Sequence, residues 1–360
     1  MTIPFNIGVL QLSMESVRET LAMAEACEAA GFDTFWIAEA YPWWRKHSFE
    51  ARSSTAILAV IASRTKRIQL GWGIISPYTR HPVQIAMEAR VMQDLAGERF
   101  LLGLGASKIF MKEIGEGEGE KIGPATVMRE SIEIVRGVLR GDAFHYRGKV
   151  FQANVPALKA DAHTPRYAPP LYVAATGPVL QKMAGSIGDG LLTASITTPA
   201  FVRYSRKNME EGARKAGKDP DQLILGSVIV GSIGQDSVKG KQGAREQAAM
   251  YLANKVQNIR GSADVLLESA GLTFEELQPI AHAMEEGGRK AAAKAVTDEI
   301  LDKVCAIAGT PEECIQRIEE YRSAGCTHIM LEIWGDDRTG QARFFGEAVL
   351  PHFRKYASRR

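Results

Sequence analysis

Residues 71–82 read GWGIISPYTRHP, and this stretch decides the fold. Its first half is apolar, contains residues of high β-propensity and is interrupted by two glycines, which is typical of the end of a buried strand. Its second half is more polar and ends at Pro82, a residue that suits the first turn of a helix because it has no N–H group. The stretch therefore predicts a strand over residues 68–76 that leads directly into a helix ending at Gly97.

The same order of strand and helix repeats on both sides of this stretch. Short runs of β-forming residues occupy residues 5–10, 34–38, 68–76, 100–104, 171–174, 190–193, 223–230 and 328–333. A helical pattern follows each run, which indicates parallel strands. Eight such units predict an α/β fold of the closed (β/α)₈ (TIM) barrel type. The rival, an open doubly wound sheet, needs a glycine-rich first turn, and Gln11-Leu12-Ser13 is not one.

We expect a single domain over residues 1–360. Residues 262–294 are polar, rich in alanine and helical in pattern. They predict a helical insertion before the last strand of the barrel.

The composition excludes several classes of protein. The chain has 360 residues, and its 45% hydrophobic content excludes a disordered chain. Its net charge of +2 argues against a nucleic-acid partner, and no apolar run reaches the roughly 18 residues that a membrane span requires. The four cysteines form no CxxC pair and the first residues lack a signal-peptide pattern, so we expect reduced thiols in a cytoplasmic protein.

Two other motifs have ordinary explanations. Residues 212–219 (GARKAGKD) approach a phosphate loop, but Asp219 replaces the required Ser or Thr and a helix precedes the motif, so it predicts a helix end. The seven histidines show no metal-binding spacing, and we expect no metal site. His81, at a strand-to-helix junction, is expected to cap or support the helix that follows.

Two strand ends suit a flat, phosphorylated ligand. The small residues after the fourth strand, over residues 103–107, let a ring approach the backbone or serve tight packing. Residues 174–178 (AATGP) end the fifth strand and open a helix, whose free N–H groups favour a phosphate. An ordinary strand-to-helix turn is the alternative for this second segment.

These segments resemble the bacterial-luciferase-like superfamily of flavin- and deazaflavin-dependent oxidoreductases. Within it, the chain most resembles the group named for methylenetetrahydromethanopterin reductase. Residues 73–82 carry the main match, and further matches follow in the family's order at residues 29–33, 99–105, 128–130, 174–178, 189–190 and 309–312. The resemblance covers nearly the whole chain and implies a (β/α)₈ barrel with an inserted segment.

The resemblance also implies a cofactor at the C-terminal mouth of the barrel. The cofactor would be coenzyme F420, a deazaflavin, with FMN as the alternative. Its ring would lie against a bulge with a non-proline cis peptide at Gly73–Ile74, and its phosphate against the start of the helix after the fifth strand. The implied cofactor-binding residues are Gly73, Ile74, Ser76, Ala106, Ser107, Thr176, Gly177 and Pro178.

Glu39 is the expected catalytic residue. It is an acidic residue that follows a strand directly, where barrel enzymes place their working groups. It could accept a hydrogen bond from the cofactor ring or carry the proton that accompanies the hydride. A salt bridge to Arg45 or Lys46 is the alternative.

The neighbouring residues suggest a substrate wall and two departures from the family. Tyr41, Trp43 and Trp44 suit a stacking pocket, or packing under a loop or at a subunit contact. Relatives often have Asp-His where this chain has Glu39-Ala40, and the methanogen reductase has an acid where this chain has Leu10.

Three functions follow from the resemblance. The first is F420-dependent hydride transfer to or from a small organic substrate, in the manner of a methylenetetrahydromethanopterin reductase. The second is an FMN-dependent, luciferase-like monooxygenase. The third is a flavin-binding protein without catalysis. We expect a small-molecule substrate and a homo-oligomer, either a dimer or a tetramer.

Overall fold

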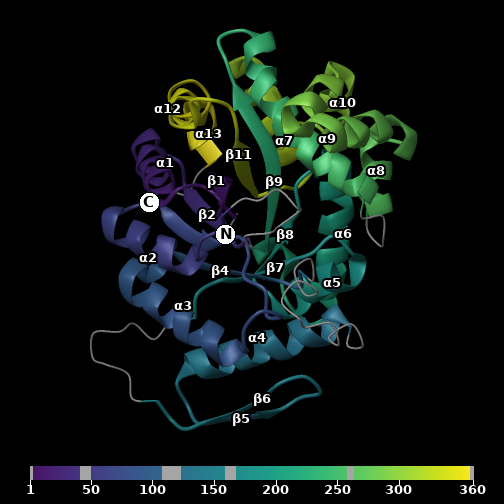
Figure 1. The fold of residues 1–360 in the computed structure, drawn as a ribbon. Coiled ribbons are helices and arrows are strands. Elements are labelled where there is room, and N and C mark those ends of the chain that lie inside the picture. Colours follow the sequence, from purple (N-terminus) through teal and green to yellow (C-terminus); the bar gives the residue numbers. More distant parts are fainter. Residues whose placement is uncertain (1–2, 41–49, 108–122, 159–167, 258–262, 357–360) are drawn as a thin grey trace.

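The computed structural model describes residues 3–40, 50–107, 123–158, 168–257 and 263–356. Eight parallel strands form a ring (Figure 1). They are β1 (Asn6–Leu12), β2 (Thr34–Ala38), β3 (Gln69–Trp72), β4 (Phe100–Gly105), β7 (Leu171–Ala174), β8 (Gly190–Thr193), β9 (Ile224–Ile233) and β11 (His328–Ile333). Because β9 pairs with both β8 and β11, and β11 pairs with β1, the ring is closed. The predicted (β/α)₈ barrel is therefore confirmed.

Helices follow these strands and cover the outside of the barrel. They are α1 (Val17–Ala30), α2 (Ser54–Arg64), α3 (Pro82–Ala96), α4 (Pro124–Arg140), α5 (Pro178–Ile187), α6 (Pro199–Lys215), α7 (Ser237–Gln257) and α12 (Arg338–Ala348). The sequence sets their ends locally. Ser16 and Glu19 form a capping box at the start of α1, and Gly31 ends that helix with a φ of 88°. His81 caps α3 through Nδ1, which accepts the N–H of Val83 at 3.2 Å, as expected for this residue.

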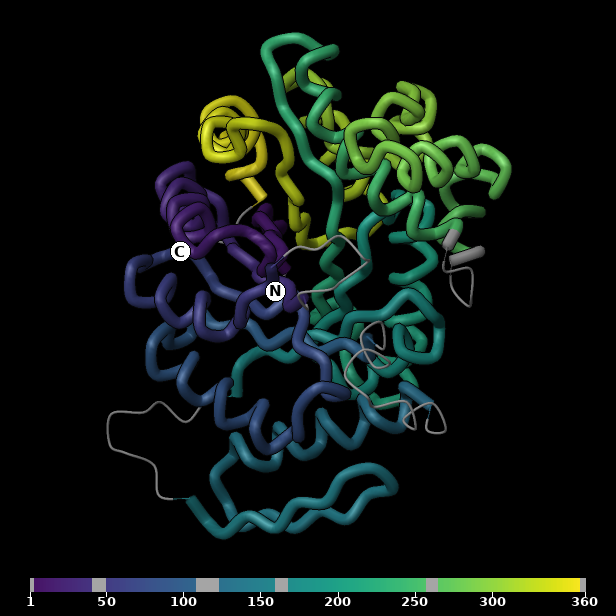
Figure 2. The backbone as a smooth tube through the Cα atoms, in the orientation of Figure 1, coloured from purple at the N-terminus to yellow at the C-terminus, as the bar shows by residue number. Residues whose placement is uncertain are grey.

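The C-terminal helices pack against α1, the first helix of the chain. In Figure 2 the C-terminal helices, in yellow, lie beside α1, in purple. The backbone N–H of Phe5 donates to the carbonyl of Tyr356 at 3.0 Å. The sequence pattern of residues 342–356 predicts a single helix that closes the chain. This prediction is wrong, because α12 ends at Ala348 and α13 (Leu350–Phe353) follows it. Pro351 has no N–H group with which to continue the hydrogen bonding of α12.

A packed floor fills the interior of the barrel. Trp36 meets Tyr172 edge to face, with ring centroids 5.7 Å apart, and lies 5.6 Å from the ring of His328. Its indole N–H donates to Thr34 Oγ1 at 2.9 Å. Gly71 leaves the room for Trp36, because a Cβ at that glycine would lie 2.1 Å from the indole ring. The barrel is therefore closed by side chains below its mouth.

Two additions extend the barrel. The hairpin of β5 (Phe144–Arg147) and β6 (Gln152–Val155) lies beyond α4 (Figure 1). Glu130 of α4 ties the hairpin down, because its carboxylate accepts the N–H groups of Lys149, Val150 and Phe151 at 2.7–2.9 Å. The second addition, between α7 and β11, contains α8 (Ala263–Ala270), α9 (Phe274–Ala295), α10 (Asp298–Lys303), β10 (Ile307–Gly309) and α11 (Pro311–Ser323).

Two strands differ most from the sequence expectation. The strand predicted over residues 68–76 ends at Trp72 as β3, because the chain leaves the ladder there and rejoins it only at an isolated bridge between Ile75 and Leu104. The strand β10 was not expected, since three residues carry no periodic pattern. It pairs with Gly231 to Ile233 of β9, on the edge that β8 leaves at Ser227.

Other general properties match the expectations. All four cysteines are free thiols. Among the residues that the structure describes, no helix has the length and apolar character needed to cross a membrane.

Candidate active site

A cavity of about 800 Å³ lies at the C-terminal mouth of the barrel. Its inner wall is apolar and includes Leu10, Leu12, Leu192, Val228 and Met330. Seven of the eight residues assigned to the cofactor line it: Gly73, Ile74, Ala106, Ser107, Thr176, Gly177 and Pro178. The eighth, Ser76, lies directly behind this wall, and its hydroxyl donates to the carbonyl of Ser107 at 3.1 Å. Strand ends that are far apart in the sequence thus meet at one site.

One wall of the cavity is the chain after β3. The peptide bond between Gly73 and Ile74 is cis, as the family resemblance implied. The N–H of Gly73 donates to the carbonyl of Ile37 at 2.9 Å, and that of Ile75 to Gly103 at 3.0 Å, so this segment is fixed to β2 and β4. Gly105 lets the Ile74 side chain lie close to β4, since a Cβ there would stand 3.0 Å from Ile74 Cδ1.

Another part of the cavity wall is the start of α5. Gly177 is the N-cap residue with extended backbone (φ −87°, ψ 151°), and Pro178 occupies the first helical position. In the described part of the chain no side chain caps this helix, and a Cβ at Gly177 would meet no atom within 4 Å. The helix start is therefore open, and its N–H groups and dipole favour an anionic group.

Glu39 does not line the cavity. It lies behind the mouth, where Arg80 Nη2 donates to both of its carboxylate oxygens at 2.6 Å. Arg80 also donates to Glu88 at 2.7 Å, and Thr55 donates to the same Glu88 oxygen at 2.9 Å. Burial disfavours the charged guanidinium, but the two carboxylates outweigh it and raise the pKa of Arg80 above its usual value.

This ion pair identifies a salt-bridge partner of Glu39 that the sequence analysis did not name. The sequence offered Arg45 or Lys46 as partners, and both lie outside the described residues. Arg80, a member of the family signature, is the partner that the structure shows. The catalytic role of Glu39 stays a prediction. Tyr41, Trp43 and Trp44, predicted to form a substrate wall, also lie outside the described residues.

Sequence reasoning missed a second acidic residue at the mouth. Glu332, near the end of β11, is 1% exposed. Tyr251 and Gln247 of α7 and Ser195 after β8 contact its carboxylate, and Tyr251 and Ser195 also line the cavity. The signal was present in the sequence. Glu332 is the one carboxylate in the strand HIMLEI, and it shares a face with Met330.

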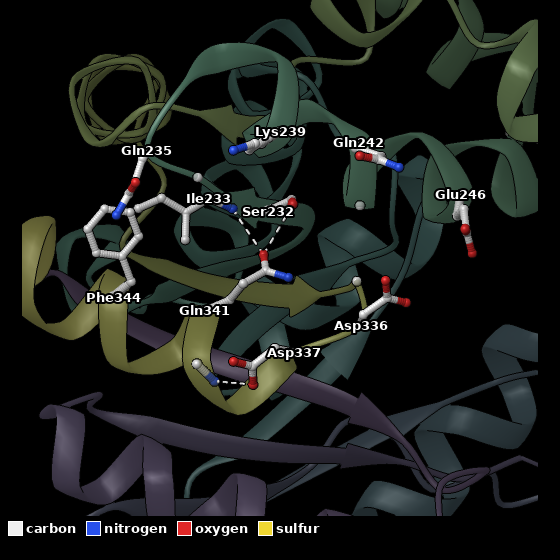
Figure 3. Close-up of a pocket in the computed structure, with 14 residues that line it drawn as sticks. Ser232, Ile233, Gln235, Lys239, Gln242, Glu246, Asp336, Asp337, Gln341 and Phe344 are labelled. Carbon is white, nitrogen blue, oxygen red and sulfur yellow. Dashed lines mark hydrogen bonds between the residues drawn. The ribbon is translucent and has the colours of Figure 1, made fainter.

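A second cavity, of about 390 Å³, lies between the ends of β9 and β11 and the starts of α7 and α12 (Figure 3). Its polar groups hold these elements together. Gln341 Oε1 accepts the Ser232 hydroxyl at 3.1 Å and the N–H of Ile233 at 3.0 Å. Asp337 caps α12 by accepting the N–H of Gly340 at 2.8 Å. We assign this cavity to the packing of α12 against β9.

A closed parallel barrel with an apolar cavity at its mouth, beside the open start of α5, has the arrangement of the (β/α)₈ barrel enzymes, whose sites lie at this end of the strands. The family comparison agrees. The chain matches the model of the family described as luciferase-like monooxygenase over residues 1–328, and it belongs to that family.

Individual relatives indicate more specific activities within this family. The chain is 30% identical to a 5,10-methylenetetrahydromethanopterin reductase of Archaeoglobus fulgidus, over 90% of this chain and 92% of that protein. It is 28% identical to an F420-dependent glucose-6-phosphate dehydrogenase of Amycolatopsis mediterranei, over 94% of this chain and 95% of that protein. The solved structure of the coenzyme F420-dependent tetrahydromethanopterin reductase of Methanopyrus kandleri matches with a TM-score of 0.85 at 28% identity, covering 98% of this chain and 100% of that one. By its family and these relatives, the chain is an oxidoreductase.

Proposed function

We propose that this chain is a coenzyme F420-dependent oxidoreductase that transfers a hydride between the deazaflavin and a small organic substrate. The observation that carries the proposal is the mouth cavity, which gathers seven of the eight residues assigned to the cofactor. Its volume of about 800 Å³ is within the range of small-molecule and cofactor sites. The F420 dependence named for relatives of similar length supports the choice of cofactor.

The residues present fit a deazaflavin. The apolar wall beside Gly73 and Ile74 suits a flat ring, and the small residues Ala106 and Ser107 line the same cavity. The open start of α5 at Gly177 suits a phosphate. When bound, a deazaflavin supplies a ring carbon that gives or accepts a hydride. The chain's own contribution is to hold the ring, bind the phosphate and keep water from the reacting face.

FMN is the second candidate cofactor. A flavin ring and phosphate would use the same wall and the same helix start. The family is described as luciferase-like monooxygenase, and oxygen chemistry of that kind is chemistry that a flavin can carry out. We place F420 first because the more similar relatives are named for it.

Glu39 is the proposed catalytic carboxylate, and both of its predicted roles stay open. Its chain neighbour Ala38 lines the cavity, whereas the Glu39 carboxylate lies behind the wall and accepts two charge-assisted hydrogen bonds from Arg80. Leu10 makes the wall apolar where the methanogen reductase has an acid, so we do not extend the proposal to one named substrate.

We further propose a cytoplasmic homo-oligomer. A reducing compartment suits the four free cysteines. On α3, Met87, Val91 and Leu95 repeat every four residues and are 63%, 50% and 44% exposed, so they form one apolar stripe. Val60 on the neighbouring α2 is 41% exposed. A second copy of the chain would cover this surface.

The test of the activity supplies both directions of hydride transfer. Reduced F420 is mixed with methylenetetrahydromethanopterin, and oxidised F420 with glucose 6-phosphate, while the deazaflavin absorbance is followed. Turnover in either mixture supports the proposal. Turnover that needs FMN and oxygen, with none from F420, would overturn it in favour of a monooxygenase.

A further inference from the structure

The mouth cavity is built by two different arcs of the barrel. The residues assigned to the cofactor follow β3, β4 and β7, which are consecutive strands of the ring. The apolar inner wall comes from β8, β9, β11 and β1, which are also consecutive. Its members are Leu192, Val228, Met330, Leu10 and Leu12. A cofactor held by the first arc therefore leaves the inner wall to the substrate.

The centre of the inner wall is packed from three strands. Val228 and Met330 are direct partners in the ladder between β9 and β11, and both face the interior of the barrel. Gly226 lies two residues before Val228 and has no side chain. A Cβ at Gly226 would lie 2.8 Å from Leu192 Cδ2 and 3.4 Å from Met330 Cε, so these two side chains fill the space above it. Leu192, Val228 and Met330 thus form one buried apolar surface.

The inner wall reaches the position proposed for the cofactor ring. A Cβ at Gly73 would lie 3.0 Å from Leu10 Cδ1, so Leu10 stands beside the cis peptide between Gly73 and Ile74. A group bound on the inner wall would therefore lie next to a ring held against Gly73 and Ile74. Hydride transfer requires this closeness, because reacting atoms must approach to about 3–3.5 Å.

The chemistry of the inner wall selects a hydrocarbon group. Its side chains are those of leucine, valine and methionine, which have no hydrogen-bond donor. A hydroxyl or carboxylate placed on them would lose its hydrogen bonds to water without replacement from these side chains. A hydrocarbon group would instead gain roughly fourfold in affinity for each methylene that it buries.

Polar residues also line this half of the cavity, but they stand outside the inner wall. Thr193 ends β8, and its hydroxyl donates to Ser227 Oγ at 3.0 Å. Ser195 follows β8, and Tyr251 and Lys255 belong to α7. The polar part of a substrate can meet these residues while its hydrocarbon part meets the inner wall.

We propose that the inner wall is a substrate subsite for a hydrocarbon group and that Val228 is a specificity-determining residue in it. The substrate class is an organic molecule with an alkyl or hydrocarbon ring group beside its reacting carbon. The inference deepens the proposed function, on which it rests, by naming the part of the substrate that this wall recognises. Val228 is chosen because its strand, β9, lies between those of Leu192 and Met330.

The test measures the binding of straight-chain alcohols from propanol to hexanol, and of 1,6-hexanediol, to the F420-loaded protein. Ligand-observed NMR gives the dissociation constants. The affinity of the wild-type protein is expected to rise roughly fourfold with each added methylene. Hexanol is expected to bind about tenfold more tightly than 1,6-hexanediol, because the second hydroxyl of the diol would meet the apolar wall.

A matched pair of variants assigns this preference to the inner wall. Val228→Thr keeps the size of the side chain and adds a hydroxyl, so it should reduce the preference for hexanol over the diol to about twofold. Val230→Thr makes the same change two residues further along β9, at a buried position that does not line the cavity. This control should keep the tenfold preference of the wild-type protein, about one hydrogen bond's worth of affinity.

Three results would overturn the inference while the proposed function stands: an affinity that does not rise with chain length, no binding of hexanol to the F420-loaded protein, or equal preferences in the two variants. A wild-type protein that does not bind F420 would overturn the proposed function. The same alcohols measured on the cofactor-free protein then decide the subsite alone. A preference lost in Val228→Thr and kept in Val230→Thr supports it, and any other pattern overturns it.

Discussion

At the scale of single residues, the cofactor site depends on a position without a side chain. A Cβ at Gly177 would meet no atom within 4 Å, and its backbone is extended, so the fold tolerates a larger residue there. A side chain at that position would instead occupy the space in front of the α5 N-terminus. Gly177→Val is therefore expected to leave the free energy of unfolding unchanged within about 0.5 kcal/mol. It should weaken F420 binding by at least roughly tenfold, about 1.4 kcal/mol.

The measurement is a fluorescence titration of F420 with the variant, beside its unfolding curve. Gly177→Ala, with a smaller group, should show an intermediate loss. Gly73→Val is a poorer probe of the site, since its Cβ would stand 3.0 Å from Leu10 Cδ1 and 3.3 Å from Trp36 Cβ and so would strain the fold. If Gly177→Val bound F420 as tightly as the wild-type protein does, the phosphate would not lie at the start of α5.

His328 makes stability depend on pH. Burial lowers the pKa of its imidazole to about 3. An unfolded histidine titrates near 6.5, so between about pH 6.5 and pH 3 the unfolded chain binds a proton that the folded chain does not. The stabilisation is complete above that window, and within the window it falls by about 1.4 kcal/mol for each pH unit of acidification.

Chemical unfolding at several pH values between 7 and 4 measures how much His328 contributes to the pH dependence of stability. Wild-type protein should lose stability more steeply on acidification than His328→Asn, by about that slope. Parallel pH profiles for the two proteins would show that His328 does not titrate as its burial implies.

At the scale of elements, one ion-pair network joins the end of β2 to α3. The side chains of Arg80, Glu39 and Glu88 are 14%, 10% and 22% exposed. Removing the shared cation leaves the most buried carboxylate without its guanidinium. Arg80→Met is therefore expected to lower the free energy of unfolding by on the order of 3 kcal/mol. Glu88→Gln, which keeps the inner pair, should cost about 1 kcal/mol or less, and equal losses in the two variants would contradict this account.

The elements also show what the sequence could and could not predict. Strands such as β7 and β8 were predicted with their observed bounds, because apolar runs between helices carry a clear pattern. The strand β10 has three residues and no pattern, and it exists because the long β9 offers an unpaired edge. The split between α12 and α13 follows from Pro351, a local signal that the periodicity of the surrounding residues obscured.

The sequence could indicate those parts of the candidate site that lie within one short segment of the chain. The family resemblance implied the residues at 73–74, 106–107 and 176–178, and each group follows a strand, so barrel geometry brings them together. The partner of Glu39 was not predictable from its neighbours, since Arg80 lies 41 residues away. Glu332 was overlooked because it lies inside a strand, where only the register of β11 reveals that it faces the mouth.

At the scale of the whole molecule, each of the eight ring strands in the described residues is paired on both sides, and the exposed stripe on α3 is the surface that we propose for contact between copies. Val91 stands in the middle of the exposed stripe on α3. Val91→Glu is expected to shift the protein from oligomer to monomer, because it places a charge in the apolar contact. Light scattering measures the mass. Val238→Glu is the control, since Val238 on α7 is 74% exposed and lies outside the stripe, and a monomeric wild-type protein would contradict the prediction.

The central claim is that the mouth cavity holds a deazaflavin. Its most direct test is an equilibrium titration of the purified wild-type protein with F420 and, separately, with FMN. F420 is expected to bind at least tenfold more tightly than FMN, a difference of about 1.4 kcal/mol. Tighter binding of FMN, or no binding of F420, would contradict it.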